Sequence, residues 1–210
     1  MTGHARGIAH PTPVALGRPH LWHGTPHASG TSQATPVASV RQLGHGGGMA
    51  ADKTFRGNAS QFFIAAELCR RELYAVVTLG NTPNTDILCS DREGKKFVHI
   101  QVKTFLPGNA TCSVGIKAEK DNGPNFFWVL GGIPDPPSKE FRYFIIPSAV
   151  MAKNVYEAHK KWEQTPGKDG RPHSQDSKFR TVTIPPATNQ YSWDISEYED
   201  RWDLIEEKLR

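Results

Sequence analysis

The sequence of 210 residues has few of the features that mark secreted or membrane proteins. It contains only three cysteines, Cys69, Cys89 and Cys112. Their odd number and wide spacing argue against a disulfide framework or paired zinc ligands, and favour buried, reduced thiols in a cytoplasmic protein. No apolar run approaches the roughly 18 residues needed to cross a bilayer, so no membrane span is predicted.

The first 48 residues lack every acidic residue and every lysine. They hold three arginines, five prolines, nine glycines and six of the nine histidines, without a helical or alternating apolar pattern. Such a stretch buries too little apolar surface to offset its ordering entropy, so we predict a disordered Gly-, Pro- and His-rich extension over residues 1–53. Three functional interpretations stay open: scattered metal-binding histidines, a transit peptide, or translation from Met49 with a non-native preceding segment. The last is favoured.

The net charge of +4 comes mostly from this extension. Subtracting its three arginines from the 25 basic residues leaves 22, against 21 acidic residues. The remainder is nearly neutral, so binding to nucleic acid must rest on a local basic patch. A solvated polar face is the alternative interpretation of the candidate residues for such a patch, which are Lys117, Lys120, Arg171, His173, Lys178 and Arg180.

Residues 54–210 are predicted to form one domain. A helix is expected from an N-cap at Ser60 to about Leu73, with an apolar face of Phe62, Ala65, Ala66, Cys69 and Leu73. Further apolar patterns predict strands at 74–79, 85–90, 96–105, 111–117, 126–131, 142–146 and 179–184, and helices at 147–164 and 196–209. This order predicts an α+β (mixed α/β) fold in which helices flank a central mixed β-sheet.

Three polar residues interrupt two of the apolar strands. Asp86 begins one strand, and Gln101 and Lys103 are two apart on the next, so the latter two share a face. A hairpin turn around Gly94 brings Asp86 toward them. Carboxylate and amide oxygens suit Mg²⁺, and a lysine beside them can orient an attacking water and stabilise charge on phosphorus. The pattern therefore predicts phosphodiester hydrolysis.

The segment from Gly57 to Thr104 resembles the core of the PD-(D/E)xK nuclease superfamily, particularly its Holliday-junction-resolvase-like and small uncharacterised endonuclease members. The resemblance rests on the helix sequence Ala65-Ala66-Glu67-Leu68, on Asp86, and on Gln101-Val102-Lys103-Thr104. It implies a restriction-endonuclease-like core and a Mg²⁺- or Mn²⁺-dependent DNA endonuclease. Such proteins often dimerise, so a homodimer is also expected.

By this resemblance, Asp86 and Gln101 hold the metal, and Lys103 positions the attacking water. Active resolvase-like members carry a glutamate near the start of the first helix, where this chain has Gln61. Glu67 follows six residues later, on a different face of the helix. Gln61 or Glu67 would complete the catalytic site, or catalysis has been lost.

Two further hypotheses follow from these departures. A catalytically inactive nucleic-acid-binding module on the same fold would explain the missing helix glutamate. A protein-interaction domain would make the arrangement of Asp86, Gln101 and Lys103 a coincidence, and would lack a basic surface around Asp86.

Overall fold

The computed structural model describes residues 53–79, 82–134, 140–167, 169–174 and 177–210. All of them belong to one unit, His45–Arg210. The predictions for the extension, including a start at Met49, concern residues outside the described part apart from Lys53. Within the described ranges, no helix is both long enough and apolar enough to span a membrane.

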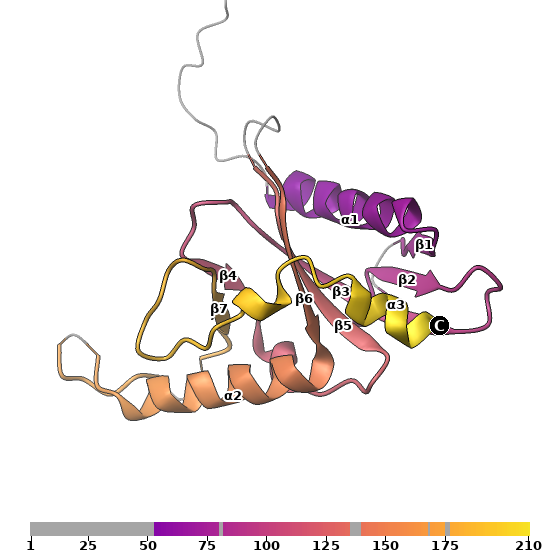
Figure 1. Cartoon of the computed structure of the whole chain (residues 1–210). Coiled ribbons are helices and arrows are strands. Elements are labelled where there is room, and N and C mark those ends of the chain that lie inside the picture. Colours follow the sequence, from indigo (N-terminus) through magenta and orange to yellow (C-terminus); the bar gives the residue numbers. More distant parts are fainter. Residues whose placement is uncertain (1–52, 80–81, 135–139, 168, 175–176) are drawn as a thin grey trace, which may run out of the picture. The chain divides into compact units, whose positions relative to one another are not determined.

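Five strands form the central sheet, in the order β1-β2-β3-β5-β6 (Figure 1). Their bounds are Tyr74–Val77, Ile87–Ser90, Phe97–Phe105, Phe126–Gly132 and Arg142–Pro147. Strands β1, β2 and β3 are antiparallel neighbours, β3 and β5 run parallel, and β5 and β6 are antiparallel. The predicted mixed sheet flanked by helices is therefore confirmed.

The connection from β3 to β5 contains a short strand, β4 (Thr111–Ser113), and the 3-10 helix η1 (Ile116–Glu119). Strand β4 pairs with β7 (Thr181–Thr183) in a separate two-stranded sheet. The predicted strand at 111–117 ends early because Gly115, with a φ of 74°, turns the chain into η1. The strand predicted at 179–184 is likewise shorter than expected.

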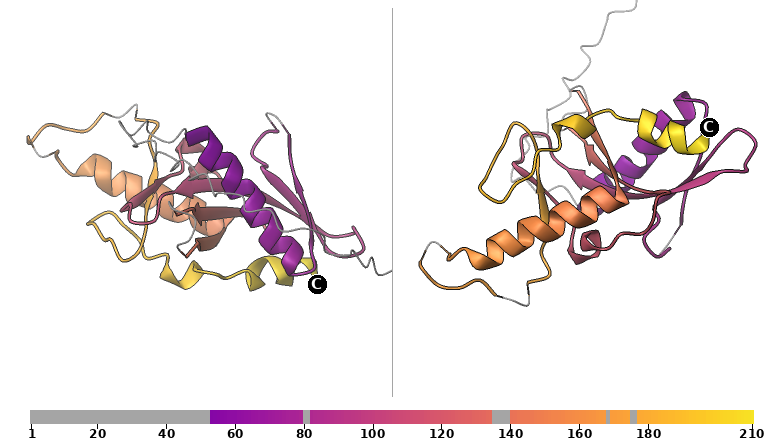
Figure 2. Two further views of the ribbon diagram at one scale, coloured as in Figure 1. Left: turned by 90° about the horizontal axis from the view of Figure 1, so that it is seen from above. Right: turned by 60° about the horizontal axis from the view of Figure 1, so that its bottom comes forward.

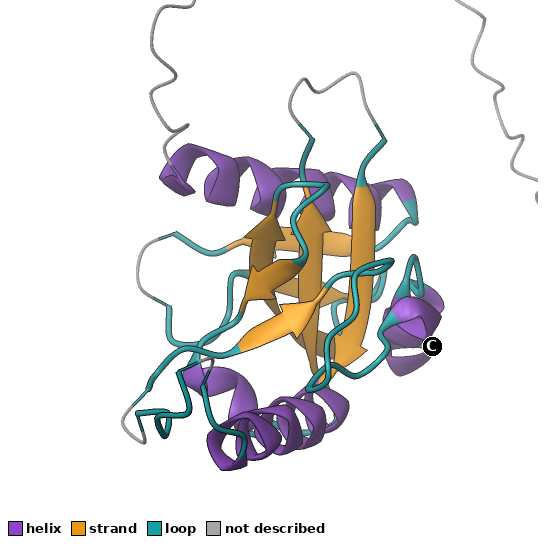
Figure 3. Ribbon diagram, turned by 90° about the vertical axis from the view of Figure 1, so that its left-hand side faces the viewer, coloured by secondary structure: helices purple, strands orange, loops and turns teal. Residues whose placement is uncertain are grey.

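Helices cover both faces of the central sheet (Figure 3). One face carries α1 (Lys53–Arg70) and α3 (Asp203–Leu209), and the other carries α2 (Ser148–Gln164). Figure 2 shows α3 beside the end of α1, where Arg71 pairs with Glu206 at 3.1 Å. Side chains alternate along β3, so each face of the sheet contributes to its own apolar core. Val98, Ile100 and Val102 pack in the core on the α1 side.

Helix α1 differs from its prediction in its length and in its buried face. It includes residues from Lys53 onward, so Ser60 is an interior residue and not the N-cap. The buried apolar positions are Ile64, Ala65 and Leu68, whereas three residues expected on the buried face are exposed, namely Phe62, Ala66 and Cys69. Two apolar stripes compete on this helix, and only packing against the sheet decides between them.

The helix predicted at 196–209 is broken into two pieces. A 3-10 helix, η2 (Ser196–Tyr198), precedes α3, and Asp200 between them has a φ of 51°. Here the chain pairs with β6: the N–H of Asp200 donates to the carbonyl of Tyr143 (2.9 Å), and Glu199 accepts from Arg142 (2.6 and 2.9 Å). This tertiary pairing interrupts the helical pattern.

Gly131 on β5 allows α1 to approach the sheet closely. A Cβ atom at this position would lie 2.3 Å from Oγ of Ser60, which is fully buried and has no hydrogen-bond partner among the described residues. Gly131→Ala is therefore expected to lower the free energy of unfolding by about 1–3 kcal/mol through overpacking.

The cost should fall in a Ser60→Ala background, because the next nearest Ser60 atom would lie 3.6 Å away. Denaturant unfolding of the wild type, both single variants and the double variant measures this coupling. Additive effects of the two substitutions would contradict the assigned clash.

Candidate functional site

Asp86 is held where β1, β2 and β3 meet. It immediately precedes β2, after a turn in which Asn84 has a φ of 59°. Its N–H donates to the carbonyl of Ile100 (2.9 Å), and its carbonyl accepts from the N–H of Thr78 (2.9 Å). Because the main chain is bonded on both sides, neighbouring strands determine the position of this aspartate.

The carboxylate of Asp86 contacts β3 at Gln101 and Val102. Its Oδ2 atom accepts hydrogen bonds from Nε2 of Gln101 and from the N–H of Val102, the latter at 2.7 Å. Gln101 and Lys103 lie on the same side of β3, opposite to the side that packs on α1. The structure thus brings a carboxylate, an amide and an ammonium group to one face of the sheet.

The charge of Lys103 acts on two groups, the half-buried carboxyl of Asp86 and the buried thiol of Cys112. Burial raises the pKa of the Asp86 carboxyl, and the N–H of Val102, the charge of Lys103 and the amide of Gln101 oppose this rise. Burial also raises the pKa of the Cys112 thiol to about 12, against the opposing charge of Lys103. The charge of Lys103 therefore influences both the Asp86 carboxyl and the Cys112 thiol.

The raised pKa of Asp86 makes stability depend on pH. Between its unfolded and folded pKa values, the folded chain binds more protons than the unfolded chain, so the stability that this group contributes is lost as the pH rises. Asp86→Asn removes the ionisable carboxyl, so the variant does not lose stability at this position as the pH rises. The melting temperature of the variant should therefore exceed that of the wild type by more at pH 7 than at pH 4, in calorimetry at constant ionic strength. A difference that shrinks toward pH 7 would contradict this sign.

The two helix candidates lie apart from Asp86. Helix α1, which carries Gln61 and Glu67, packs on the opposite face of the sheet. Glu67 forms ion pairs with Arg70 (2.7 Å) and Arg71 (2.9 Å), and the hydrogen bond from Arg70 is the main cause of its lowered pKa. Gln61 is half-buried, and no hydrogen bond of its side chain is found with the described residues. The structure joins neither residue to Asp86.

The six basic candidates lie in η1, directly after η1, and in the segment between α2 and β7. Lys117, Lys120, Arg171 and Lys178 are exposed. His173 is half-buried, and its ring stacks on Trp162 with 3.9 Å between centroids. Arg180 is only 7% exposed; it pairs with Glu119 and donates to the carbonyls of Ser177 (2.6 Å) and Phe179 (2.9 Å). The guanidinium of Arg180 is therefore occupied by contacts within the fold.

Two polar groups near Asp86 were not predicted as part of the site. One is the N–H of Val102, a main-chain donor that no sequence pattern reveals. The other is the pair of Thr85 and His99, whose Oγ1 and Nδ1 atoms lie 3.2 Å apart. The alternation of β3 gives a partial signal for His99, because this residue shares the face of Gln101.

The oxygen atoms around Asp86 are of the type that binds hard cations, but only one of them comes from a carboxylate. The described residues contain no group of three or more His, Cys, Asp or Glu side chains able to hold a metal. Oδ1 of Asp86 accepts no hydrogen bond from any of the described residues. In a strand, the N–H and C=O of one residue point to the same side, so the Val102 carbonyl also lies on the Asp86 edge. With Oε1 of Gln101, these three oxygens match the ligand type of Mg²⁺, which often completes its shell with water and substrate phosphate.

Comparisons with known proteins give little further information. No protein-family model matches the chain, and no curated protein matches it. Among solved structures, a bacterial homing endonuclease, I-Ssp6803I, is similar with a TM-score of 0.45 and 14% sequence identity. The match covers 75% of this chain and 93% of that one. At this level of similarity the match does not identify a function for this chain.

Proposed function

We propose that this protein is a divalent-metal-dependent DNA endonuclease of the PD-(D/E)xK type. The observation that carries the proposal is the convergence of Asp86, Gln101 and Lys103 on one sheet face. A half-buried carboxylate whose pKa is raised by burial costs stability, which is a common property of functional sites. Lys103 lies on the same face and forms no ion pair with the described acidic residues, which also fits a functional site.

The metal ligands would be Oδ1 of Asp86, Oε1 of Gln101 and the main-chain carbonyl of Val102. A bound Mg²⁺ or Mn²⁺ would supply Lewis acidity at the scissile phosphate and lower the pKa of the attacking water. The Val102 N–H and the Gln101 amide both donate to Oδ2 of Asp86 and so fix the orientation of the carboxylate. The second oxygen, Oδ1, would then be held in position to bind the metal. This preorganisation reduces the cost of assembling the site.

Lys103 would orient the attacking water and stabilise the charge that develops on the phosphate. Its charge opposes the rise in the pKa of the Asp86 carboxyl, which supports a role beside the proposed metal ligands. We leave Glu67 out of the site because Arg70 and Arg71 neutralise its carboxylate. Gln61 remains a candidate outer contact, and a homodimer remains a proposal from the resemblance alone.

A cleavage assay tests this function directly. The purified chain is incubated with supercoiled, linear, single-stranded and branched DNA, in Mg²⁺, in Mn²⁺ and with EDTA. Cleavage of at least one substrate that depends on the metal is expected. Absence of cleavage under all metal conditions would refute the enzyme proposal.

One observation favours the second candidate function, a catalytically inactive DNA-binding module. In the structure the Gln101 amide donates to Asp86, a contact that a glutamate at this position would not make. A site with a single carboxylate also binds a dication weakly. DNA binding without cleavage in either metal would support this candidate.

A further inference from the structure

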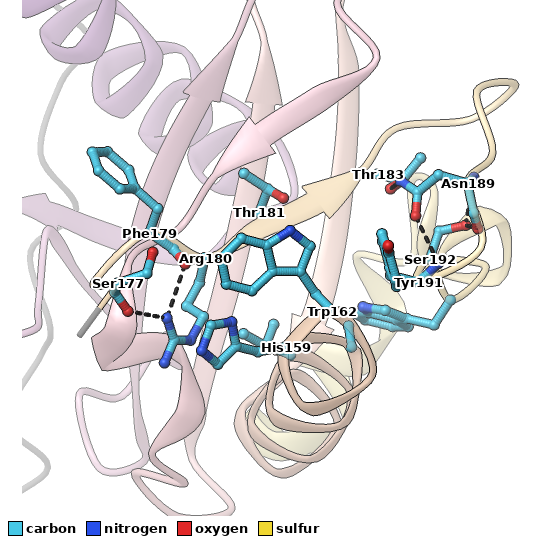
Figure 4. A pocket seen from close by; sticks show the side chains of 13 residues that line it. His159, Trp162, Ser177, Phe179, Arg180, Thr181, Thr183, Asn189, Tyr191 and Ser192 are labelled. Atoms are coloured by element: carbon cyan, nitrogen blue, oxygen red, sulfur yellow. Dashed lines mark hydrogen bonds between the residues drawn. The ribbon is translucent and has the colours of Figure 1, made fainter. Parts of the chain in front are cut away.

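A second site lies between helix α2 and strand β7, away from Asp86. It is a pocket of about 230 Å³ built from α2, from residues 177–183 and from residues 189–193. Figure 4 shows Phe179 and Arg180 on one side of the Trp162 ring, and Tyr191 and Asn189 on the other. Pockets for drug-sized ligands usually exceed about 300 Å³, so this one suits a smaller group.

Phe179 is the most unusual residue of this pocket. It is 81% exposed, although phenylalanine gains about 1.5–3 kcal/mol from full burial. Its ring forms no aromatic contact with the described residues, whereas Trp162 is stacked on both His159 and His173. An aromatic ring held in solvent beside a pocket is available to stack on a planar ligand.

The charge around the pocket indicates an anionic partner. None of its lining residues is acidic, and its one charged residue, Arg180, is neutralised by Glu119. The nearby acidic Glu163 is likewise paired, with Lys160 at 2.8 Å. Within the described residues, no ion pair is formed by four exposed cations on this side, Lys117, Lys120, Arg171 and Lys178. Lys178 directly precedes Phe179 in the chain and is exposed, although it is not one of the lining residues.

The pocket is joined to the central sheet through β7 and β4. Thr181 and Thr183 line the pocket, and Val182 between them pairs with Cys112 on β4. The charge of Lys103 acts on Cys112 from the central sheet. The two-stranded sheet therefore links the pocket to β3, the strand that carries Lys103.

We propose that this pocket binds one unpaired base of the DNA substrate, stacked on Phe179, while exposed cations hold the flanking phosphates. The inference rests on the proposed nuclease function and adds a substrate class, DNA with an unpaired or extrahelical base. Aromatic stacking combined with basic residues is the general mode of binding unpaired nucleotides. Lys178, the exposed cation that precedes Phe179 in the chain, would be one of the phosphate contacts.

The test measures the affinity of the full chain for three fluorescent DNAs, by anisotropy, in EDTA and at fixed ionic strength. The DNAs are an oligothymidylate of about 12 nucleotides, a hairpin duplex, and the same duplex with one bulged thymine. Phe179→Ala should weaken binding of the oligothymidylate and of the bulged duplex by about 5- to 100-fold, and leave the plain duplex unchanged. Phe179→Trp should retain binding, whereas Phe179→Leu, which keeps the apolar bulk, should not. Phe55→Ala, at a phenylalanine that is 75% exposed on α1, is the matched control.

Equal binding by the Phe179→Leu variant and the wild type would overturn the stacking proposal. So would equal weakening of all three DNAs by Phe179→Ala, or failure of the wild type to bind the unpaired DNAs. Cleavage in Mg²⁺ is measured on the same DNAs, which separates the two proposals. Cleavage with no effect of Phe179 on binding would refute this pocket alone, and Phe179-dependent binding without cleavage would refute the nuclease alone.

Discussion

Asp86→Asn is expected to reduce metal-dependent DNA cleavage by about 10³-fold or more, the upper scale for removing one preorganised electrostatic group. Asp86 is the only carboxylate at the proposed metal site, so its loss removes the only anionic ligand. Asparagine retains an oxygen that can accept from the Val102 N–H, and Gln101 can rotate its amide to pair with the new side chain. The fold should therefore persist, and circular dichroism checks it.

Binding separates this effect from damage to the DNA-contacting surface. Without metal, Asp86→Asn should leave DNA affinity unchanged or slightly higher, because a negative charge near phosphate is lost. Asp91→Asn is the matched control. Asp86 lies directly before β2 and Asp91 lies directly after it. Its Oδ1 accepts from the N–H groups of Lys95 (2.7 Å) and Lys96 (3.2 Å), contacts that asparagine preserves. Equal cleavage by the wild type and Asp86→Asn would refute the site.

Lys103→Met is expected to reduce cleavage by about 10²–10³-fold through a different cause. The substitution keeps a long apolar side chain beside β4 and removes only the ammonium group. Water orientation and stabilisation of the developing charge are then lost, while the proposed metal ligands remain. Single-turnover cleavage at saturating protein measures this loss without a contribution from binding.

Lys103→Met should also weaken DNA binding modestly, unlike Asp86→Asn. Loss of one phosphate contact should lower the slope of log affinity against log salt by about 0.9. Lys95→Met, in the exposed turn between β2 and β3, is the control and should change neither cleavage nor the slope. If Lys103→Met alters only binding and the wild type never cuts, the inactive DNA-binding module becomes the better description.

Much of the central sheet could be predicted from the sequence because the relevant signals are local. The period-two alternation of β3 places Gln101 and Lys103 on one face, whatever packs around them. The short turn between β2 and β3 makes their antiparallel pairing nearly obligatory, and this pairing brings Asp86 to Gln101. The same locality explains why the predicted and observed bounds of β3, β5 and α2 differ by two residues at most.

Other features depended on contacts between residues far apart in the chain. The buried face of α1 was mispredicted because Phe62 and Ile64 are both apolar, and only the sheet selects Ile64. The break before α3 results from the pairing of Glu199 and Asp200 with β6, which competes with helix formation. Neither contact leaves a signal within its own segment.

The sequence by itself determined which residues share the face of β3, and hence which chemical groups can meet at Asp86, because strand geometry is local. Only the tertiary structure decided how those groups are used. It buries Asp86 against the Val102 N–H, and it pairs Glu67 with arginines on the other face. It also assembles the Phe179 pocket from three separate segments. Burial and long-range pairing arise from the packing of the whole chain, so no local pattern encodes them.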